Sequence, residues 1–208
     1  MIKTPRMKWI RGWIGVLALG CVVLQYITPP IEADTSSPFI YTIRYFSFFT
    51  IQSNLFAALV LLVPLMSRGR FAEWLDSAGV RAATVLYLTV TGLVYFTLLR
   101  HTWNPQGLTY VADRGLHYVV PCLVALEWWL FAAKRGLSIR HLRYFAIFPI
   151  LYFAYTLAAG AISGFYPYPF FNAAQLGYGQ VLLAGVALLM VFVVLGAGII
   201  RVARLRAG

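Results

Sequence analysis

Six long stretches of apolar residues, separated by short polar connections, dominate the chain. They cover roughly residues 9–27, 45–66, 81–100, 116–134, 144–163 and 178–200. Each is close to the ~20 residues that an α-helix needs to cross a bilayer. Their apolar residues are continuous rather than alternating, which favours helices over barrel strands. The pattern predicts an all-α bundle of six transmembrane helices, forming one integral membrane domain over residues 1–208.

The composition agrees with a lipid environment. Hydrophobic residues make up 61% of the chain and charged residues 11%, against roughly 45–50% and 25% in soluble domains. The first apolar stretch resembles a signal peptide in its basic start. However, no small-residue cleavage pattern ends it, and five more apolar stretches follow. We therefore interpret it as the first membrane helix.

The basic residues predict the orientation of the helices. Of the 17 Lys and Arg residues, only Arg44, Arg100 and Arg114 lie near the first, third and fifth connections. The other fourteen lie at the two ends and in the second and fourth connections: Lys3, Arg6, Lys8, Arg11, Arg68, Arg70, Arg81, Lys134, Arg135, Arg140, Arg143, Arg201, Arg204 and Arg206. The positive-inside rule then places both termini in the cytoplasm.

The net charge of +11 is therefore assigned to topology and to contacts with anionic membrane lipids. Nucleic acid is not an expected partner, because the basic residues flank apolar stretches. The compact size and the absence of targeting tails suggest the inner membrane of a bacterium. The sequence does not predict an oligomeric state.

Two outward connections have a distinctive composition. The first, residues 29–34, is acidic and rich in proline, and the fifth, residues 165–172, reads Phe-Tyr-Pro-Tyr-Pro-Phe-Phe-Asn. Aromatic residues near helix ends typically form a belt at the membrane interface, which is the favoured interpretation of the fifth connection. The alternative is a lid that dips into the membrane.

A polar stripe lies at the start of the second apolar stretch. Ser47, Thr50, Ser53 and Asn54 fall within about 120° of arc on a helix and begin near the outer surface. Polar side chains are costly in lipid, so their clustering indicates function. Hydrogen bonding between packed helices is an equally open interpretation.

His117, near the outer end of the fourth stretch, lies at a depth similar to Ser47 and Thr50. A hydroxyl beside an imidazole is the minimum for nucleophilic catalysis, because the imidazole takes the hydroxyl proton as the oxygen attacks a carbonyl. Asp113, four residues earlier, is placed to orient the imidazole. It is equally suited to cap the helix or to remain a solvated charge.

Other polar residues carry weaker signals. Glu127 lies about 15 Å deeper than His117 at 1.5 Å per residue, where a structural anchor is favoured over a proton site. Tyr95 and Tyr155 belong to stripes that line a cavity for an amphipathic ligand or make contacts between helices. His101 and His117 form a weak pair for haem, because His101 borders a loop. We expect no metal and no cofactor.

At Arg44–Asn54 and His117–Glu127 the chain resembles the androgen-induced and FAR-type family of six-helix membrane proteins, and its bacterial relatives most of all. The second stretch shares the aromatic-Ser-aromatic-aromatic-Thr start with Ser53-Asn54, and the fourth shares His117, Pro121 and Glu127. Characterised animal members are intramembrane hydrolases that cleave fatty-acid esters of hydroxy fatty acids.

The resemblance implies a threonine nucleophile and a histidine, which is His117. The family's basic-Tyr-Leu-Thr-Phe pattern aligns without gaps on Arg44–Phe48 and then places the nucleophile at Ser47; a short shift places it at Thr50, which we prefer. Our hypothesis is a hydrolase of lipid esters that uses Thr50 or Ser47 with His117, and Ser53, Asn54, Asp113, Glu127, Tyr95 and Tyr155 as substrate-binding residues. The alternative is a non-catalytic protein that binds or passes a lipid or small amphiphile.

Overall fold

The structure, a computed structural model, describes residues 5–29 and 37–207. These residues form helices and connections without any β-strand, which confirms the all-α prediction. Lys3 and the acidic part of the first connection, residues 30–34, lie outside the described residues.

The helices follow the predicted apolar stretches closely, with short helices added between them. Their bounds are α1 Pro5–Ile27, α2 Pro38–Phe46, α3 Phe49–Met66, α4 Arg70–Leu75, α5 Ala78–Val94, α6 Gly107–Arg114, α7 Val120–Phe131, α8 His141–Ser163 and α9 Ala173–Ala207. Two π-helical segments, η1 Tyr95–Leu99 and η2 Gly115–Val119, continue α5 and join α6 to α7, and η3 Pro169–Phe171 is a 3₁₀ turn. Helix α9 changes direction at Gly177, which has a φ of 75°.

Within the described residues, five helices are long and apolar enough to cross a membrane: α1, α3, α5 with η1, α8 and α9. The fourth predicted stretch, 116–134, forms a segmented helical run instead. It begins with α6 at Gly107, passes through η2 and ends with α7 at Phe131. The π-helical segment η2 divides the run, and the run begins earlier than predicted because Asp113 and Arg114 are helical, although charged residues in a sequence suggest a connection.

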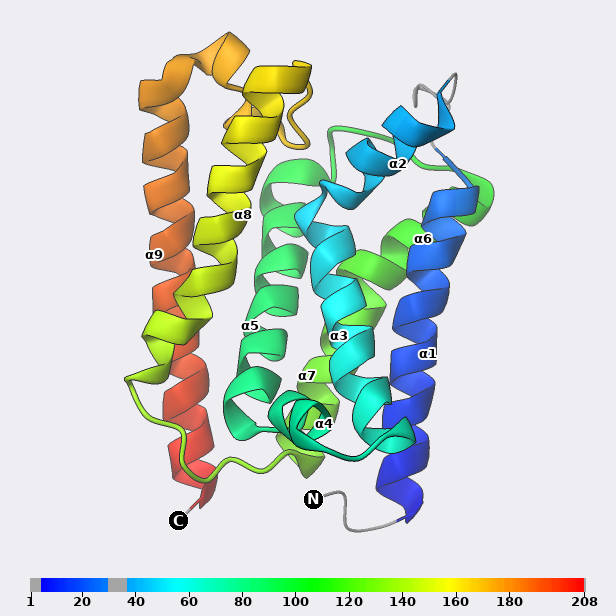
Figure 1. Cartoon of the computed structure of the whole chain (residues 1–208), viewed down its shortest axis with the longest axis vertical. Helices are drawn as coiled ribbons and strands as arrows, with labels where there is room; N and C mark the ends of the chain where they lie inside the picture. Colours follow the sequence, from blue (N-terminus) through cyan, green and yellow to red (C-terminus); the bar gives the residue numbers. More distant parts are fainter. Residues whose placement is uncertain (1–4, 30–36, 208) are drawn as a thin grey trace.

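The helices pack lengthwise in a bundle, with α2 at one end and α4 at the other (Figure 1). The described starts of α1 and ends of α9 lie at the end that carries α4. Helix α1 packs mainly on α3, and α5 lies among α3, α7 and α9. Helix α8 packs mainly on α9 and touches α5 only weakly, so α8 and α9 form a hairpin beside the rest of the bundle.

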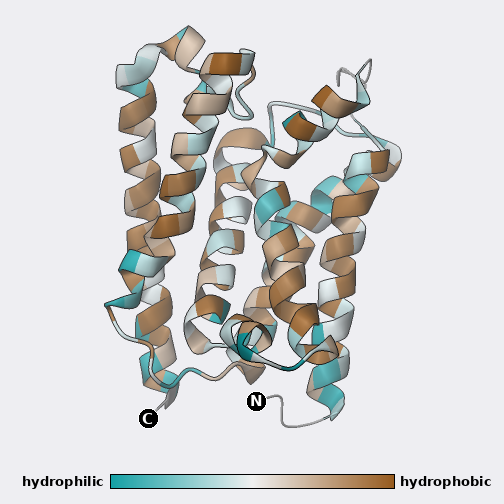
Figure 2. Cartoon of the chain, viewed as in Figure 1, coloured by the Kyte–Doolittle hydropathy of each residue, from teal (hydrophilic) through white to brown (hydrophobic). Residues whose placement is uncertain are grey.

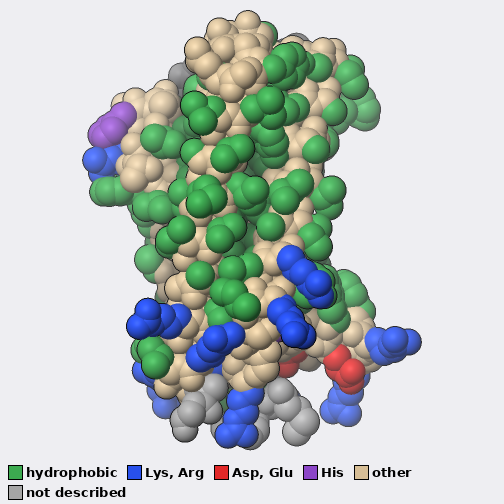
Figure 3. All heavy atoms as spheres, turned by 90° about the vertical axis from the view of Figure 1, so that its left-hand side faces the viewer, with side chains coloured by type: hydrophobic (Ala, Val, Ile, Leu, Met, Phe, Trp, Pro, Cys, Tyr) green, Lys and Arg blue, Asp and Glu red, His purple; other side chains and the backbone are tan. Residues whose placement is uncertain are grey.

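The surface is apolar along most of its length. Hydrophobic residues cover the middle of the bundle, and hydrophilic residues gather towards the α4 end (Figure 2). On the face drawn in Figure 3, almost all Lys and Arg side chains lie around that same end. Large apolar side chains on α1, α8 and α9 are exposed, among them Trp13, Leu151, Ile162, Leu183 and Val194. Such a surface fits lipid rather than water.

The second predicted stretch is broken, not continuous, at Ser47 and Phe48. Ser47 ends α2, and Phe48 is extended, with φ −75° and ψ 130°, before α3 begins at Phe49. The carbonyl groups freed by the break accept hydrogen bonds from elsewhere. The Tyr152 hydroxyl donates to Ser47 O at 2.9 Å, and Gln52 Nε2 donates to Phe46 O at 3.0 Å. These contacts explain why a break is stable without Gly or Pro.

The α4 end holds a buried ionic cluster of Arg11, Asp76, Arg81 and Glu127. Arg11 donates to Asp76 at 2.8 Å and to Val60 O at 3.1 Å, while Arg81 pairs with both Asp76 and Glu127. Arg11 and Arg81 therefore make internal ion pairs in addition to their predicted contribution to topology. The cluster joins α1, α3, α4, α5 and α7. Glu127 is thus part of a structural anchor between helices, the role that the sequence favoured for it.

Candidate active site

Thr50 and His117 meet at the end of the bundle opposite α4. Thr50 Oγ1 and His117 Nε2 lie 3.2 Å apart, within hydrogen-bonding distance. Thr50 lies in the first turn of α3, directly after the break at Ser47 and Phe48, and His117 is the middle residue of η2. The predicted pairing of a hydroxyl with this imidazole is thus geometrically possible for Thr50.

Asp113 and Tyr95 contact the imidazole on parts of the ring that do not face Thr50. His117 Nδ1 lies 2.9 Å from the backbone oxygen of Asp113 and 3.0 Å from its Oδ1, and the alignment favours the backbone oxygen. The Tyr95 hydroxyl donates to Asp113 Oδ2 at 2.6 Å, and its ring stacks on the imidazole with centroids 3.8 Å apart. With a proton on Nδ1, the lone pair of Nε2 faces Thr50, as a general base requires.

The two π-helical segments carry Tyr95 and His117, and such segments often occur at functional sites. Close packing fixes their positions. A Cβ at Gly92 would lie 2.9 Å from the backbone oxygen of His117, and a Cβ at Gly115 would collide with Cys21 Sγ. Glycine at these two positions lets α5 and α1 approach η2. The position of His117 therefore depends on both glycines.

Ser53 and Asn54 brace the site without bordering it. Asn54 Nδ2 donates to Thr50 O at 2.8 Å and to Leu116 O at 3.2 Å, which ties α3 to η2. Ser53 Oγ donates to Thr50 O at 3.1 Å and lies 3.0 Å from Thr91 Oγ1. Both residues are completely buried. In this part of the stripe the polar side chains act in helix packing, one of the two interpretations left open by the sequence.

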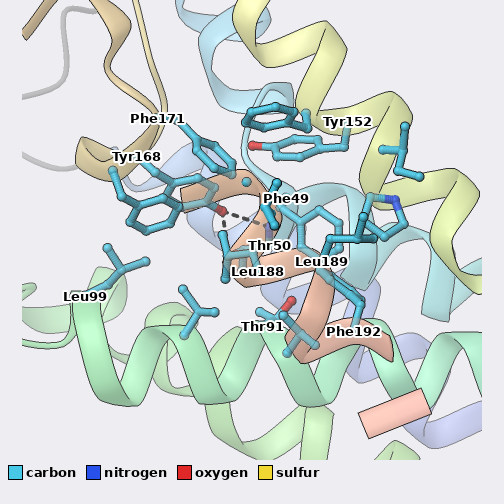
Figure 4. Close-up of a pocket in the computed structure, with 18 of the residues that line it drawn as sticks. Phe49, Thr50, Thr91, Leu99, Tyr152, Tyr168, Phe171, Leu188, Leu189 and Phe192 are labelled. Carbon is cyan, nitrogen blue, oxygen red and sulfur yellow. Dashed lines mark hydrogen bonds between the residues drawn. The ribbon is translucent and has the colours of Figure 1, made fainter. Parts of the chain in front are cut away.

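Tyr168, from the fifth connection, also contacts Thr50. The backbone N–H of Thr50 donates to the Tyr168 hydroxyl at 3.3 Å, and Thr50 Oγ1 lies 3.4 Å from the same oxygen (Figure 4). Tyr168 and Phe171 are buried, so the favoured prediction of an interfacial belt is wrong for these two residues. Burial raises the pKa of the Tyr168 hydroxyl, which keeps it protonated and able to donate.

A cavity of about 590 Å³ borders the pair, and we call it the His117 cavity. Its wall includes both Thr50 and His117, with Tyr95 and Tyr168 beside them. Apolar and aromatic side chains form most of the remainder, and Gln25, Arg44 and Thr102 add polar groups. A mostly apolar cavity with a few convergent polar groups is typical of a site for a small amphipathic molecule.

Besides Ser53, Asn54 and Asp113, three more of the predicted site residues are absent from the wall of this cavity. The Ser47 hydroxyl donates to Arg44 O at 2.6 Å, and because of the helix break Ser47 does not share a helix face with Thr50, contrary to the prediction. Glu127 is in the ionic cluster at the opposite end. Tyr155 is 42% exposed on the outside of α8 and does not line this cavity.

Tyr168 is the site residue that sequence reasoning did not select. Its only signal was the Tyr-Pro-Tyr-Pro run and the lid alternative attached to it. Within the described ranges, no group of three or more His, Cys, Asp and Glu side chains is placed to hold a metal ion. His101 is exposed, and Arg100 Nε lies 2.9 Å from its Nε2.

No protein-family model, curated protein or solved structure matches this chain. The functional argument therefore depends on the geometry of the site itself.

Proposed function

We propose that this protein is an integral membrane hydrolase of lipid fatty-acid esters, with Thr50 as the nucleophile and His117 as the general base. The observation that carries the proposal is the 3.2 Å contact between Thr50 Oγ1 and His117 Nε2 at the wall of the His117 cavity. A nucleophile needs a base within hydrogen-bonding distance, and the base needs a third group to orient it. Asp113 fills the third role.

The reaction proceeds in two halves. Thr50 Oγ1 attacks the ester carbonyl carbon while its proton passes to His117 Nε2. The bond from carbon to the ester oxygen then breaks, and His117 returns the proton to the departing alcohol. Water attacks the acyl-threonine with His117 again as base, and Thr50 regains its proton as the fatty acid leaves.

Two donors lie where the carbonyl oxygen gains negative charge. They are the Thr50 backbone N–H and the Tyr168 hydroxyl, which contact each other in the absence of substrate. A carbonyl oxygen placed between them would accept from both. Because Thr50 lies at the N-terminus of an 18-residue helix, the helix dipole also favours negative charge there.

The proposal also includes an arrangement of the chain in the membrane. The segmented run α6–η2–α7 serves as a sixth crossing, both termini face the cytoplasm of a bacterium, and the site opens near the outer leaflet of the inner membrane. Support comes from the concentration of Lys and Arg at the α4 end (Figure 3) and the positive-inside rule. The partners are membrane lipids, one of which is the lipid-like substrate.

The test is hydrolysis of a panel of long-chain esters by the purified protein in lipid vesicles. We compare wild type with Thr50→Ala, Thr50→Ser, Ser47→Ala and His117→Ala, and search for an acyl group on Thr50 by mass spectrometry. Activity retained by Ser47→Ala and Thr50→Ser but lost in the other two supports the proposal. A folded wild type that binds esters without cleaving any of them would instead support a protein that binds or passes lipids.

A further inference from the structure

A second, smaller cavity begins at Thr50 and extends among α5, α8 and α9 (Figure 4). We call this cavity, of about 180 Å³, the α9 chamber. Thr50, Leu99 and Tyr168 line both cavities, whereas His117 lines only the His117 cavity. The nucleophile therefore lies at the junction of two spaces, and the general base faces only one of them.

The polar groups of the α9 chamber are few. Its hydroxyl groups belong to Thr50, Thr91, Tyr152 and Tyr168. The rest of the wall is apolar and includes Val90, Val94, Phe153, Leu182, Leu189 and Phe192. Along α9 the lining extends from Leu182 to Phe192, about 15 Å at 1.5 Å per residue. An apolar space that starts at a polar junction and follows α9 for about 15 Å suits a single hydrocarbon chain.

The position of His117 decides which chain of an ester enters the chamber. The imidazole must hand its proton to the departing alcohol and later activate the water that replaces this alcohol. Both events require the alcohol to be on the imidazole side, which is the His117 cavity. The acyl group stays attached to Thr50 throughout, so its chain must extend from the junction in the other direction.

We propose that the α9 chamber is the acyl-chain site of the enzyme and sets the acyl length that it accepts, while the His117 cavity receives the alcohol portion. This assignment rests on the proposed hydrolase function. It predicts separate selection for the two halves of a substrate, because different side chains line the two spaces.

The experiment measures kcat/KM in vesicles for two series of esters. One series varies the acyl chain from acetyl to palmitoyl on a fixed alcohol, and the other varies the alcohol on a fixed short acyl group. Leu189→Trp and Val94→Phe fill the α9 chamber from two different helices. Leu183→Trp is the matched control, because Leu183 is on the same helix but is 71% exposed and outside the lining. Gln25→Trp fills the His117 cavity.

The expected result is a fall of about tenfold or more in kcat/KM for palmitoyl esters relative to acetyl esters in Leu189→Trp and Val94→Phe, with this ratio unchanged in Leu183→Trp. Gln25→Trp should discriminate against large alcohols and not against long acyl chains. Retained acetyl-ester cleavage also shows that each variant is folded.

Two results would overturn the assignment while leaving the hydrolase intact: unchanged acyl selection in both chamber variants, or a change in alcohol selection instead. A wild type that cleaves neither acetyl nor palmitoyl esters removes the hydrolase proposal and this assignment together.

Discussion

The bundle buries polar side chains at both ends, and the two clusters differ in chemistry and in access. At the α4 end, Arg11 and Arg81 face Asp76 and Glu127 within a packed interior. At the opposite end, Thr50, His117, Asp113, Tyr95 and Tyr168 are linked through hydrogen bonds and one stacked ring pair. The second cluster borders the His117 cavity.

The difference indicates separate tasks for the two clusters. Opposite charges in close contact compensate each other's lost hydration, and the result is a rigid link among five helices. In the Thr50 cluster, several groups surround one imidazole, and one nitrogen of that imidazole points at a hydroxyl on a cavity wall. Such an arrangement contributes less to holding helices together and leaves a nucleophile accessible to a ligand.

The largest expected effect is on activity at the Thr50 cluster. Thr50→Ala or His117→Ala should lower kcat for ester hydrolysis by about 10³-fold, because each change removes a participant in the proton transfer. The melting temperature should change little. Thr97→Ala is the control, since the Thr97 hydroxyl donates only to Leu93 O on an exposed helix face. Activity that survives in His117→Ala would contradict the assignment of the base.

The next effect is on stability, at the opposite end. Glu127→Gln should lower the free energy of unfolding by about 3 kcal/mol, because it removes one of the two carboxylates that pair with the buried Arg81. The change is measured by denaturant titration in mixed micelles. Glu73→Gln, on the exposed side of α4, should have no effect. The activity of each folded molecule should remain at the wild-type level, and a large fall in kcat would connect Glu127 to the chemistry.

Tyr168→Phe should have an intermediate effect on rate. Removing the hydroxyl leaves only the Thr50 backbone N–H to stabilise the charged carbonyl oxygen, so kcat should fall by about 10²-fold with little change in KM. The matched variant is Tyr166→Phe on the same connection, which should behave as wild type because Tyr166 does not line either cavity. Equal losses in both variants would indicate disturbance of the connection rather than loss of a donor.

The smallest of the four effects is expected for Asp113→Asn. The backbone oxygen of Asp113 still holds His117 Nδ1, so the tautomer persists and only the stabilising charge is lost. We expect kcat to fall by about tenfold, well short of the ~10⁴-fold loss that follows when an imidazole loses the group that fixes its tautomer. A loss as large as that of His117→Ala would show that the carboxylate, not the backbone, fixes the ring.

The apolar stretches were sufficient to predict most of the fold, because length and hydrophobicity alone decide whether a helix can span lipid. The same reasoning placed the start of the fourth helical run too late and missed the break at the start of the second stretch. In both places the decisive contacts come from distant residues. The Tyr152 hydroxyl satisfies the carbonyl freed at Ser47, and the Tyr95 hydroxyl donates to the Asp113 carboxylate inside the helical run.

The sequence predicted only part of the candidate site. Thr50 and His117 stood out because polar side chains at equal depth in apolar stretches are unusual. Ser47 stood out equally well, and only the helix break separates it from Thr50. Tyr168 was hidden in an aromatic run, because the direction in which a loop side chain points depends on the packing of the whole connection.

The sequence by itself determined that this chain is an all-helical bundle with apolar outer surfaces, and it singled out a hydroxyl and an imidazole at one level of that bundle. The tertiary structure decided which hydroxyl meets the imidazole, which groups orient it, and where a substrate has room. Helices form from local periodicity and from the solvent around them, whereas a site requires distances of a few ångströms between residues far apart in the chain. Those distances are set by helix breaks, π-helical segments and close approaches at glycine, and none of these has a strong local signal.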